Sequence, residues 1–119
     1  MAVSELAAKI RERPGLVVID LMGDINASAE KTMSDTYAEA TNGNRSTVLL
    51  NFSDVSYINS TGIALIVGIL ASARKEGRSV AAYGLSEHYR EIFEITRLAD
   101  FMTMFADESS AVEEIVEEG

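Results

Sequence analysis

The sequence predicts an α/β fold in which a mixed, mostly parallel β-sheet is covered by about four helices. Three observations lead to this fold class. A Pro-Gly pair at residues 14–15 separates two segments of strand character, which indicates an N-terminal hairpin. Short apolar runs rich in β-branched residues then alternate with longer amphipathic segments. Gly, Asn and Ser stand at the junctions, as is typical of turns and helix caps. Strands joined by helices in this way run parallel, with right-handed crossovers.

Composition indicates a small folded domain and argues against several functions. The 119 residues fit one domain, residues 1–119, and 47% of them are apolar, which is enough for a packed core. The absence of cysteine excludes a disulfide framework, a thiolate metal site and a cysteine nucleophile. A single histidine, His88, argues against a multi-histidine metal site, and we expect it to be a solvated helix residue. We therefore expect no metal, no cofactor and no catalytic residue.

The net charge of −9 argues against nucleic acid and anionic membrane surfaces as partners, because both attract clustered Lys and Arg. No N-terminal segment combines basic residues with a long apolar core, as a signal peptide does. The apolar segment 63–73 is much shorter than the ~20 residues of a membrane-spanning helix. These features predict a soluble, cytoplasmic protein.

The first half of the chain is predicted to form a hairpin and a helix. Residues 3–12 fit both the alternation of a strand and the stripe of a helix, and the following Pro-Gly turn favours the strand. Residues 16–22 are apolar except for Asp20 and predict a central strand. The segment 27–41 carries one apolar face and predicts an amphipathic helix, which residues 42–44 (NGN) end.

The second half is predicted to begin with a strand and a helix. Residues 47–52 (TVLLNF) predict a buried strand, and residues 53–58 (SDVSYI) predict a polar turn. An apolar segment beginning at Ile63 then predicts a helix that ends at Gly77.

The last third is predicted to alternate in the same way. A short strand at residues 79–84 is followed by a helix that Ser86 caps and that runs to about Thr96. Residues 101–105 predict a peripheral strand. Asp107 and the two serines after it are expected to open a terminal helix, whose acidic residues within the segment 107–118 are expected on the solvent side.

Polar residues follow two neighbouring strands at their carboxyl ends. Sheets of this kind place the functional crevice beyond those ends, where the segments 23–27 and 53–62 would meet. Asn59, Ser60 and Thr61 stand just before the apolar helix, and their side-chain oxygens can accept the unpaired N–H groups of its first turn. Helix capping and a functional role for the two hydroxyls are compatible.

Three segments carry a family resemblance: residues 23–27 (GDINA), residues 54–64 (DVSYINSTGIA) and residues 92–98 (IFEITRL). They resemble, in the same order, the Gly-Glu-Leu-Asp-x segment, the Asp-Ser-Ser/Thr-Gly-Leu-Gly signature and the Leu-Phe-x-x-x-Gly-Leu segment of the STAS domain. This family is shared by sulfate transporters and anti-sigma factor antagonists. The resemblance covers nearly the whole chain and implies the STAS fold. The length and acidity resemble those of the single-domain anti-sigma factor antagonists.

The resemblance implies a regulatory binding protein that is not an enzyme. Such antagonists bind an anti-sigma factor that is also a serine kinase of the histidine-kinase-like ATPase fold, and the binding releases a sigma factor. The kinase later phosphorylates a serine of the antagonist, and a metal-dependent serine phosphatase removes the phosphate. By position this serine is Ser60, Thr61 is the neighbouring hydroxyl, and Gly62 allows the backbone of a partner to approach closely.

The expected partner-binding surface combines both crevice segments with the start of the helix. The residues assigned to it are Asp24, Asn26, Asn59, Ser60, Thr61, Gly62, Ile63 and Ile66. The segment 63–70 lacks the polar stripe of an amphipathic helix, so core packing and partner docking both remain open for it. Gly68 is expected to permit close packing of the helix on the sheet.

Three residues depart from the family pattern. Asn59 and Asn26 stand where the family has Asp, and Arg97 stands where it has Gly. Asparagine still caps a helix, but two negative charges beside Ser60 are missing. We hypothesise that phosphorylation here is slower, uses a different kinase or has been lost. Arg97 is expected to alter the turn after its helix.

Other functions compete with the antagonist interpretation. The same fold can serve as a scaffold, or as a constitutive partner-binding subunit of a signalling assembly that is not phosphorylated. Asp20, Asp24 and Asp54 suggest a phosphoaspartate receiver, but that class requires a lysine at the end of the last strand, where residues 105–107 (FAD) offer none. An enzyme using the crevice would need a nucleophile–base pair, a P-loop or a Rossmann glycine pattern, and the sequence contains none of them.

Overall fold

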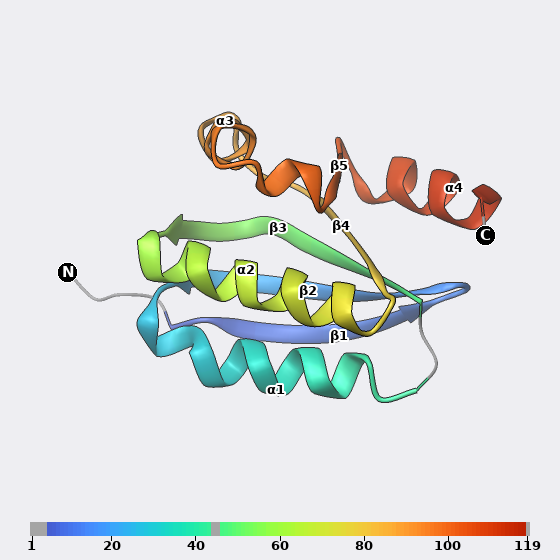
Figure 1. Ribbon diagram of the computed structural model, residues 1–119, viewed down its shortest axis with the longest axis horizontal. Helices are drawn as coiled ribbons and strands as arrows, with labels where there is room; N and C mark the ends of the chain where they lie inside the picture. Colours follow the sequence, from blue (N-terminus) through green and yellow to red (C-terminus); the bar gives the residue numbers. More distant parts are fainter. Residues whose placement is uncertain (1–4, 44–45, 119) are drawn as a thin grey trace.

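The computed structural model describes residues 5–43 and 46–118 (Figure 1). Its strands are β1 (Ala7–Arg13), β2 (Leu16–Ile25), β3 (Thr47–Ile58), β4 (Ser79–Tyr83) and β5 (Thr103–Phe105). Its helices are α1 (Glu30–Ala40), α2 (Ser60–Lys75), α3 (Glu87–Ile95) and α4 (Glu108–Glu118), with the short 3-10 helices η1 (Ala27–Ala29) and η2 (Leu98–Asp100). Residues 3 and 4 of the predicted first strand and Asn44 of the predicted helix stop lie outside the described residues.

The described strands form a five-stranded sheet in the order β1-β2-β3-β4-β5. β1 is antiparallel to β2, with Arg13 paired to Leu16 across the Pro-Gly turn, and the other neighbouring strands are parallel. The predicted hairpin and the mixed, mostly parallel sheet are thus confirmed. The ambiguous first segment is a strand from Ala7 onward.

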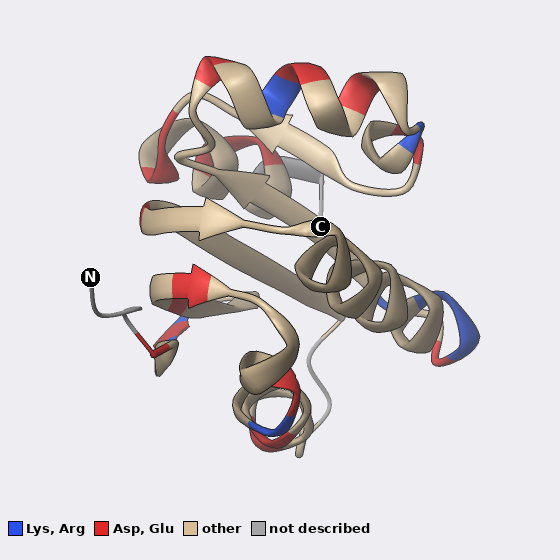
Figure 2. Ribbon diagram, turned by 90° about the vertical axis from the view of Figure 1, so that its left-hand side faces the viewer, with Lys and Arg blue, Asp and Glu red and all other residues tan. Residues whose placement is uncertain are grey.

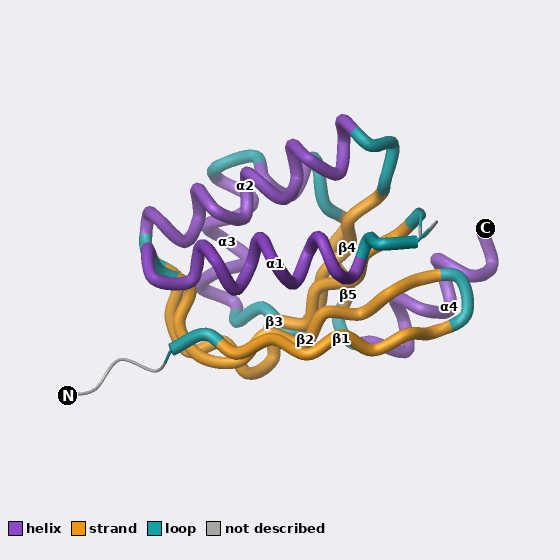
Figure 3. The backbone as a smooth tube through the Cα atoms, turned by 90° about the horizontal axis from the view of Figure 1, so that it is seen from below, coloured by secondary structure: helices purple, strands orange, loops and turns teal. Residues whose placement is uncertain are grey.

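α1, α2 and α3 cover one face of the sheet, and α4 covers the other. Figure 3 shows α1 and α2 side by side above the strands. In the larger core beneath them, the ring of Phe52 on β3 meets that of Phe93 on α3 edge-on, with centroids 6.1 Å apart. Alternate residues of the same strands, among them Leu16 and Leu49, pack under α4. Because both faces of β2 are covered, its sequence is an almost continuous apolar run.

The two central strands are longer than the sequence predicted. β2 continues beyond Met22, and β3 includes residues 53–58, which we expected to form a polar turn. Parallel pairing extends as far as Ile25 and Ile58, with register irregularities on the way. Most side chains of residues 53–58 are exposed. The segment is therefore polar although its backbone is paired as a strand.

The predicted helix caps are confirmed at three places. The Ser86 hydroxyl accepts a hydrogen bond from the Tyr89 N–H, and Asp107 Oδ1 accepts one from the Ser110 N–H. α2 ends just before Gly77, whose φ of 73° is a conformation that glycine favours.

Arg97 follows α3 in the left-handed conformation, with a φ of 69°. It occupies the position at which the family pattern has glycine, and among the described residues it is the one non-glycine with a positive φ. The turn thus forms without glycine, at a conformational cost of about 1 kcal/mol. The guanidinium of Arg97 reaches Asp100 at 2.7 Å, but an exposed ion pair of this kind offsets little of that cost.

A cluster of charged residues holds α4 to the sheet. Arg11 on β1 donates to both carboxylate oxygens of Asp20, at 2.6 and 2.8 Å, and to both of Glu108, at 2.7 and 3.1 Å. The Tyr83 hydroxyl donates to Glu108 as well. We expected the acidic residues of segment 107–118 to lie on the solvent side. Glu108 corrects this expectation, because its carboxylate faces the sheet and binds a strand arginine.

Loss of the Glu108 charge is expected to destabilise the fold in a pH-dependent way. Hydrogen bonds from Arg11 lower the pKa of Glu108 from 4.5 to about 2. A carboxylate with a lowered pKa stabilises the fold fully above its unfolded pKa, and the effect is lost as the pH falls through the folded pKa. We expect Glu108→Gln to reduce the free energy of unfolding by about 2 kcal/mol at pH 7 and by much less near pH 2, measured by urea denaturation.

The matched control for this prediction is Glu113→Gln, on the exposed side of the same helix. It should change the free energy of unfolding by less than ~0.5 kcal/mol at either pH. A loss for Glu108→Gln that is equally large at pH 7 and pH 2 would show that the carboxylate charge is not what holds α4.

Candidate functional site

The carboxyl ends of β2 and β3 lie side by side and carry the polar residues predicted for the site. Ile25 and Ile58 are paired neighbours at these ends, and Asn26 and Asn59 follow them directly. α2 starts at the same edge of the sheet (Figure 1). The two segments that were predicted to meet are therefore brought together, although they arrive as strand ends rather than loops.

Asn59 caps α2. Its Oδ1 accepts a hydrogen bond of 2.8 Å from the Gly62 N–H, and its own N–H donates to the Ile25 carbonyl oxygen at 3.2 Å. Ser60 and Thr61 are exposed, and their hydroxyls form no hydrogen bond with the described residues. Capping is thus the role of Asn59, and the Ser60 hydroxyl at the first helical position is open to solvent.

The start of α2 is electrostatically suited to an anion. The first N–H groups of a helix have no acceptor within the helix, and the aligned peptide dipoles add a positive partial charge at this end. The first turn of α2 contains no acidic residue that would oppose an anion. An oxygen on Ser60 that gained negative charge would therefore be favoured by its own helix.

Gly62 sets the distance between α2 and β2. A Cβ atom at this position would lie 2.8 Å from the carbonyl carbon of Ile25 and closer still to its oxygen, so a larger residue does not fit. We expected Gly62 to let the backbone of a partner approach. It is buried, and it allows the helix to approach its own strand instead.

The apolar part of α2 divides between core and surface. Ile66 is 0% exposed and packs in the larger core, so its predicted role in partner binding is wrong. Its position four residues after Gly62 places it on the same buried side of the helix. Ile63 is partly buried against the same core, whereas Val67 is 44% exposed. Gly68 is exposed, and a Cβ there would meet nothing within 4 Å, so it does not serve helix–sheet packing as expected.

Asn26 caps the N-terminus of η1, as Asn59 caps that of α2. Its Oδ1 accepts hydrogen bonds from the N–H and the hydroxyl of Ser28, at 3.0 and 2.6 Å. Asp24 is partly buried and pairs with Tyr57 in the β2–β3 ladder. The polar edge of the site therefore consists of Asp24, Asn26, Asn59, Ser60 and Thr61.

Two tyrosines at this edge were not predicted. Tyr57 on β3 is 55% exposed, and the turn expected at residues 53–58 gave no reason to place it on a strand. Tyr89 on α3 supports the end of the same strand, since its hydroxyl accepts a hydrogen bond of 2.9 Å from the Ile58 N–H. No local pattern around Tyr89 signals this contact, which joins residues 31 positions apart.

The acidic cluster of a phosphoaspartate receiver is not formed. The Asp20 carboxylate accepts hydrogen bonds from Arg11 and Asn51 on the face that α4 covers, and Arg11 lowers its pKa. Within residues 5–43 and 46–118, no group of three or more His, Cys, Asp and Glu is placed to hold a metal ion. No helix in that part of the chain has the length and apolarity needed to cross a membrane.

The protein is an α/β domain with a mixed sheet. The capped start of α2 lies beside the carboxyl ends of the central strands β2 and β3. The family model described as the STAS domain matches residues 7–111 of the chain. The chain belongs to the STAS domain family.

Named relatives match part of the chain. The anti-sigma-B factor antagonist of Staphylococcus epidermidis is 38% identical over 55 residues, which are 46% of this chain and 51% of that protein. The anti-sigma-B factor antagonist of Bacillus subtilis (strain 168) is 37% identical over 60 residues, which are 50% of this chain and 55% of that protein. The chain thus matches about half the length of these relatives.

Solved structures share the fold over most of the chain. The unphosphorylated anti-sigma factor antagonist SpoIIAA is 19% identical, with a TM-score of 0.71 over 93% of this chain and 98% of its own. An anti-sigma factor antagonist from Mycobacterium paratuberculosis is 14% identical, with a TM-score of 0.75 over 93% and 94%. A sulfate transporter family protein from Wolinella succinogenes is 12% identical, with a TM-score of 0.72 over 90% and 92%. At such identities the likeness establishes the STAS fold.

Two glycines of α2 provide a matched test of the helix–strand contact. Gly62→Ala places a Cβ against the Ile25 carbonyl group, and we expect it to lower the free energy of unfolding by about 3 kcal/mol. Gly68→Ala meets open space within a helix and should raise that free energy by about 1 kcal/mol through helix propensity. Urea denaturation measures both. Equal effects at the two positions would contradict the close approach of α2 to β2.

Proposed function

We propose that this STAS domain is an anti-sigma factor antagonist, which binds an anti-sigma factor while Ser60 is unmodified and thereby releases a sigma factor. The observation that carries the proposal is the exposed Ser60 hydroxyl at the first position of α2, which is not used in capping. The names of the relatives from Staphylococcus epidermidis and Bacillus subtilis support the same role. The domain acts in the cytoplasm by binding a protein, without a catalytic step of its own.

Phosphorylation of Ser60 is the proposed off switch. A phosphate adds about −1.5 to −2 charges, and the N–H groups and dipole at the start of α2 favour an anion there. The fold should therefore tolerate the modification. A partner surface that fits a neutral hydroxyl would instead meet an uncompensated charge and a larger group. The switch then acts at the interface rather than in the core.

The proposed partners are an anti-sigma factor that is a serine kinase of the histidine-kinase-like ATPase fold and a metal-dependent serine phosphatase. Asn26 and Asn59 would affect how both enzymes recognise the surroundings of Ser60. Each makes its capping hydrogen bond through Oδ1, as an aspartate oxygen would, so the exchange of Asp for Asn removes charge and keeps the geometry. We infer a kinase that does not require carboxylates beside Ser60.

The same neutral residues favour a second candidate. If recognition by the kinase or phosphatase depends on carboxylates at positions 26 and 59, this domain would be a constitutive binder or a scaffold subunit of a signalling assembly. Such a protein would use the same polar edge without a phosphate on Ser60.

Replacement of Ser60 tests the switch. We expect Ser60→Ala to bind the anti-sigma factor kinase that co-purifies with the domain as tightly as the wild type does, and Ser60→Glu to bind at least ~tenfold more weakly, measured by calorimetry. Ser109→Glu adds the same charge to an exposed position on α4 and should bind normally. Equal binding by all variants would remove the charge switch.

Transfer of radiolabelled phosphate in the same mixture separates the two candidates. Labelling of the wild type but not of Ser60→Ala identifies the regulated antagonist. A wild-type chain that binds the kinase and accepts no phosphate is the constitutive binder.

A further inference from the structure

The exposed residues of α2 form a stripe with an internal symmetry. They are Ser60, Thr61, Ala64, Val67, Gly68, Ala71, Arg74 and Lys75. Each has a counterpart at the same distance on the other side of the helix midpoint, which lies between Val67 and Gly68. A second α2 running antiparallel across the stripe would therefore meet it position by position, as a two-fold symmetric contact between identical chains requires.

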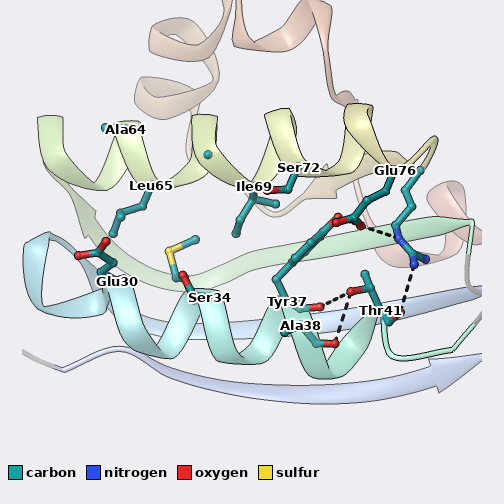
Figure 4. A pocket seen from close by; sticks show the side chains of 13 residues that line it. Glu30, Ser34, Tyr37, Ala38, Thr41, Ala64, Leu65, Ile69, Ser72 and Glu76 are labelled. Carbon is teal, nitrogen blue, oxygen red and sulfur yellow. Dashed lines mark hydrogen bonds and ion pairs between the residues drawn. The ribbon is translucent and has the colours of Figure 1, made fainter.

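The centre of this stripe is apolar and consists of small side chains. Its four middle members are Ala, Val, Gly and Ala, and a Cβ at Gly68 would meet nothing within 4 Å, so another helix can approach closely. A groove of about 710 Å³ runs beside the stripe, between α1 and α2 (Figure 4). Small side chains such as Ala38 and Ser72 line it and leave room for side chains of a second copy.

The charges of α2 lie at its C-terminal end. Figure 2 shows α2 without charged residues along most of its length and with charge at its C-terminal end. The basic residues of its last turn are Arg74 and Lys75. Neither forms an ion pair with the described residues, and the Arg74 guanidinium lies over the Phe101 ring, 5.5 Å from its centroid. The adjacent Glu76 is engaged by Arg78 at 2.9 Å. Among the described residues these two cations therefore form no ion pair, in a chain whose net charge is −9.

We propose that phosphorylation of Ser60 joins two copies of this chain through α2, in a two-fold symmetric antiparallel contact. The inference rests on the proposed function, because it requires phosphate on Ser60. In this register the middle of one α2 packs on the middle of the other. Each Ser60 then lies opposite Arg74 and Lys75 of the second copy, so the two phosphates and the two pairs of cations meet at the two ends of the contact.

The charge on residue 60 decides whether the contact forms. With an unmodified serine, the positive end of one helix would face two cations of the second copy. The net charge of −9 on each chain adds repulsion in both states, and phosphate increases it. With phosphate, each end gains charge-assisted hydrogen bonds to a guanidinium and an ammonium group. Salt screens the repulsion between whole domains beyond ~8 Å, whereas groups in direct contact are screened less.

The contact would cover Ser60 and the start of α2. A phosphorylated domain would then be kept from its partner in two ways, by the charge on Ser60 and by the second copy lying over it. Dephosphorylation would require the monomer, because the phosphate is enclosed in the dimer.

Phosphoserine incorporated at position 60 during translation tests the inference without a kinase. In sedimentation velocity of the full chain over a concentration series, we expect the unmodified chain to remain monomeric. The phosphorylated chain should dimerise with a dissociation constant at least ~tenfold lower. Phosphoserine at position 109 on α4 is the control for added charge and should leave the chain monomeric.

Two variants of the phosphorylated chain locate the contact. Gly68→Gln adds a side chain where the fold has open space, and the double change Arg74→Ala and Lys75→Ala removes the cations. Both should restore the monomer while the denaturation midpoint shows a folded chain. A phosphorylated chain that stays monomeric, an unmodified chain that dimerises equally well, or a dimer that survives both variants would overturn the proposal. Failure of the proposed function would appear separately, as unchanged kinase binding by Ser60→Glu.

Discussion

The contact between the first turn of α2 and the end of β2 is the constraint on which the site depends. Gly62 lies against the backbone of Ile25 where a Cβ has no room. The Asn59 N–H donates to the carbonyl oxygen of the same residue. Together these contacts fix where α2 begins relative to the sheet. Ser60 follows the cap on the side away from the strand and is exposed as a consequence.

The structural roles at the start of α2 are thus carried by the neighbours of Ser60. Asn59 caps the helix, Gly62 packs on the strand and Ile66 fills the core, and none of these roles involves the Ser60 hydroxyl. A charge placed on Ser60 therefore changes what the surface presents and leaves the packing intact. The same division explains why asparagine is tolerated at position 59, since its Oδ1 makes the capping hydrogen bond without a charge.

Local signals in the sequence were sufficient for most of the fold. The Pro-Gly turn, the Ser86 cap and the stop at Gly77 each depend on a few neighbouring residues, and the structure confirms all three. Residues 53–58 were misjudged because the exposed side chains of a paired strand resemble those of a turn. Glu108 was misjudged because its partner Arg11 is 97 positions away, beyond the reach of any local pattern.

The candidate site could be located from the sequence but not resolved in detail. The order of strands and polar segments placed Asp24, Asn26 and Ser60 at one edge, and the structure brings them there. The rotation of α2 about its axis was not predictable. An apolar segment without a polar stripe does not show which side of the helix faces the core. That is why Ile66 was assigned to the surface and Gly68 to the sheet, and both assignments were reversed.

The second pKa of a phosphate on Ser60 tests most directly whether this residue occupies the positive end of α2. It can be measured by ³¹P NMR titration of the phosphoserine chain, folded and in urea, with Gly68→Gln present to keep the sample monomeric. We expect a pKa below the unfolded value of about 6, because the N–H groups and dipole of the helix favour the dianion. An equal or higher pKa in the folded chain would contradict the placement of Ser60 on which the account depends.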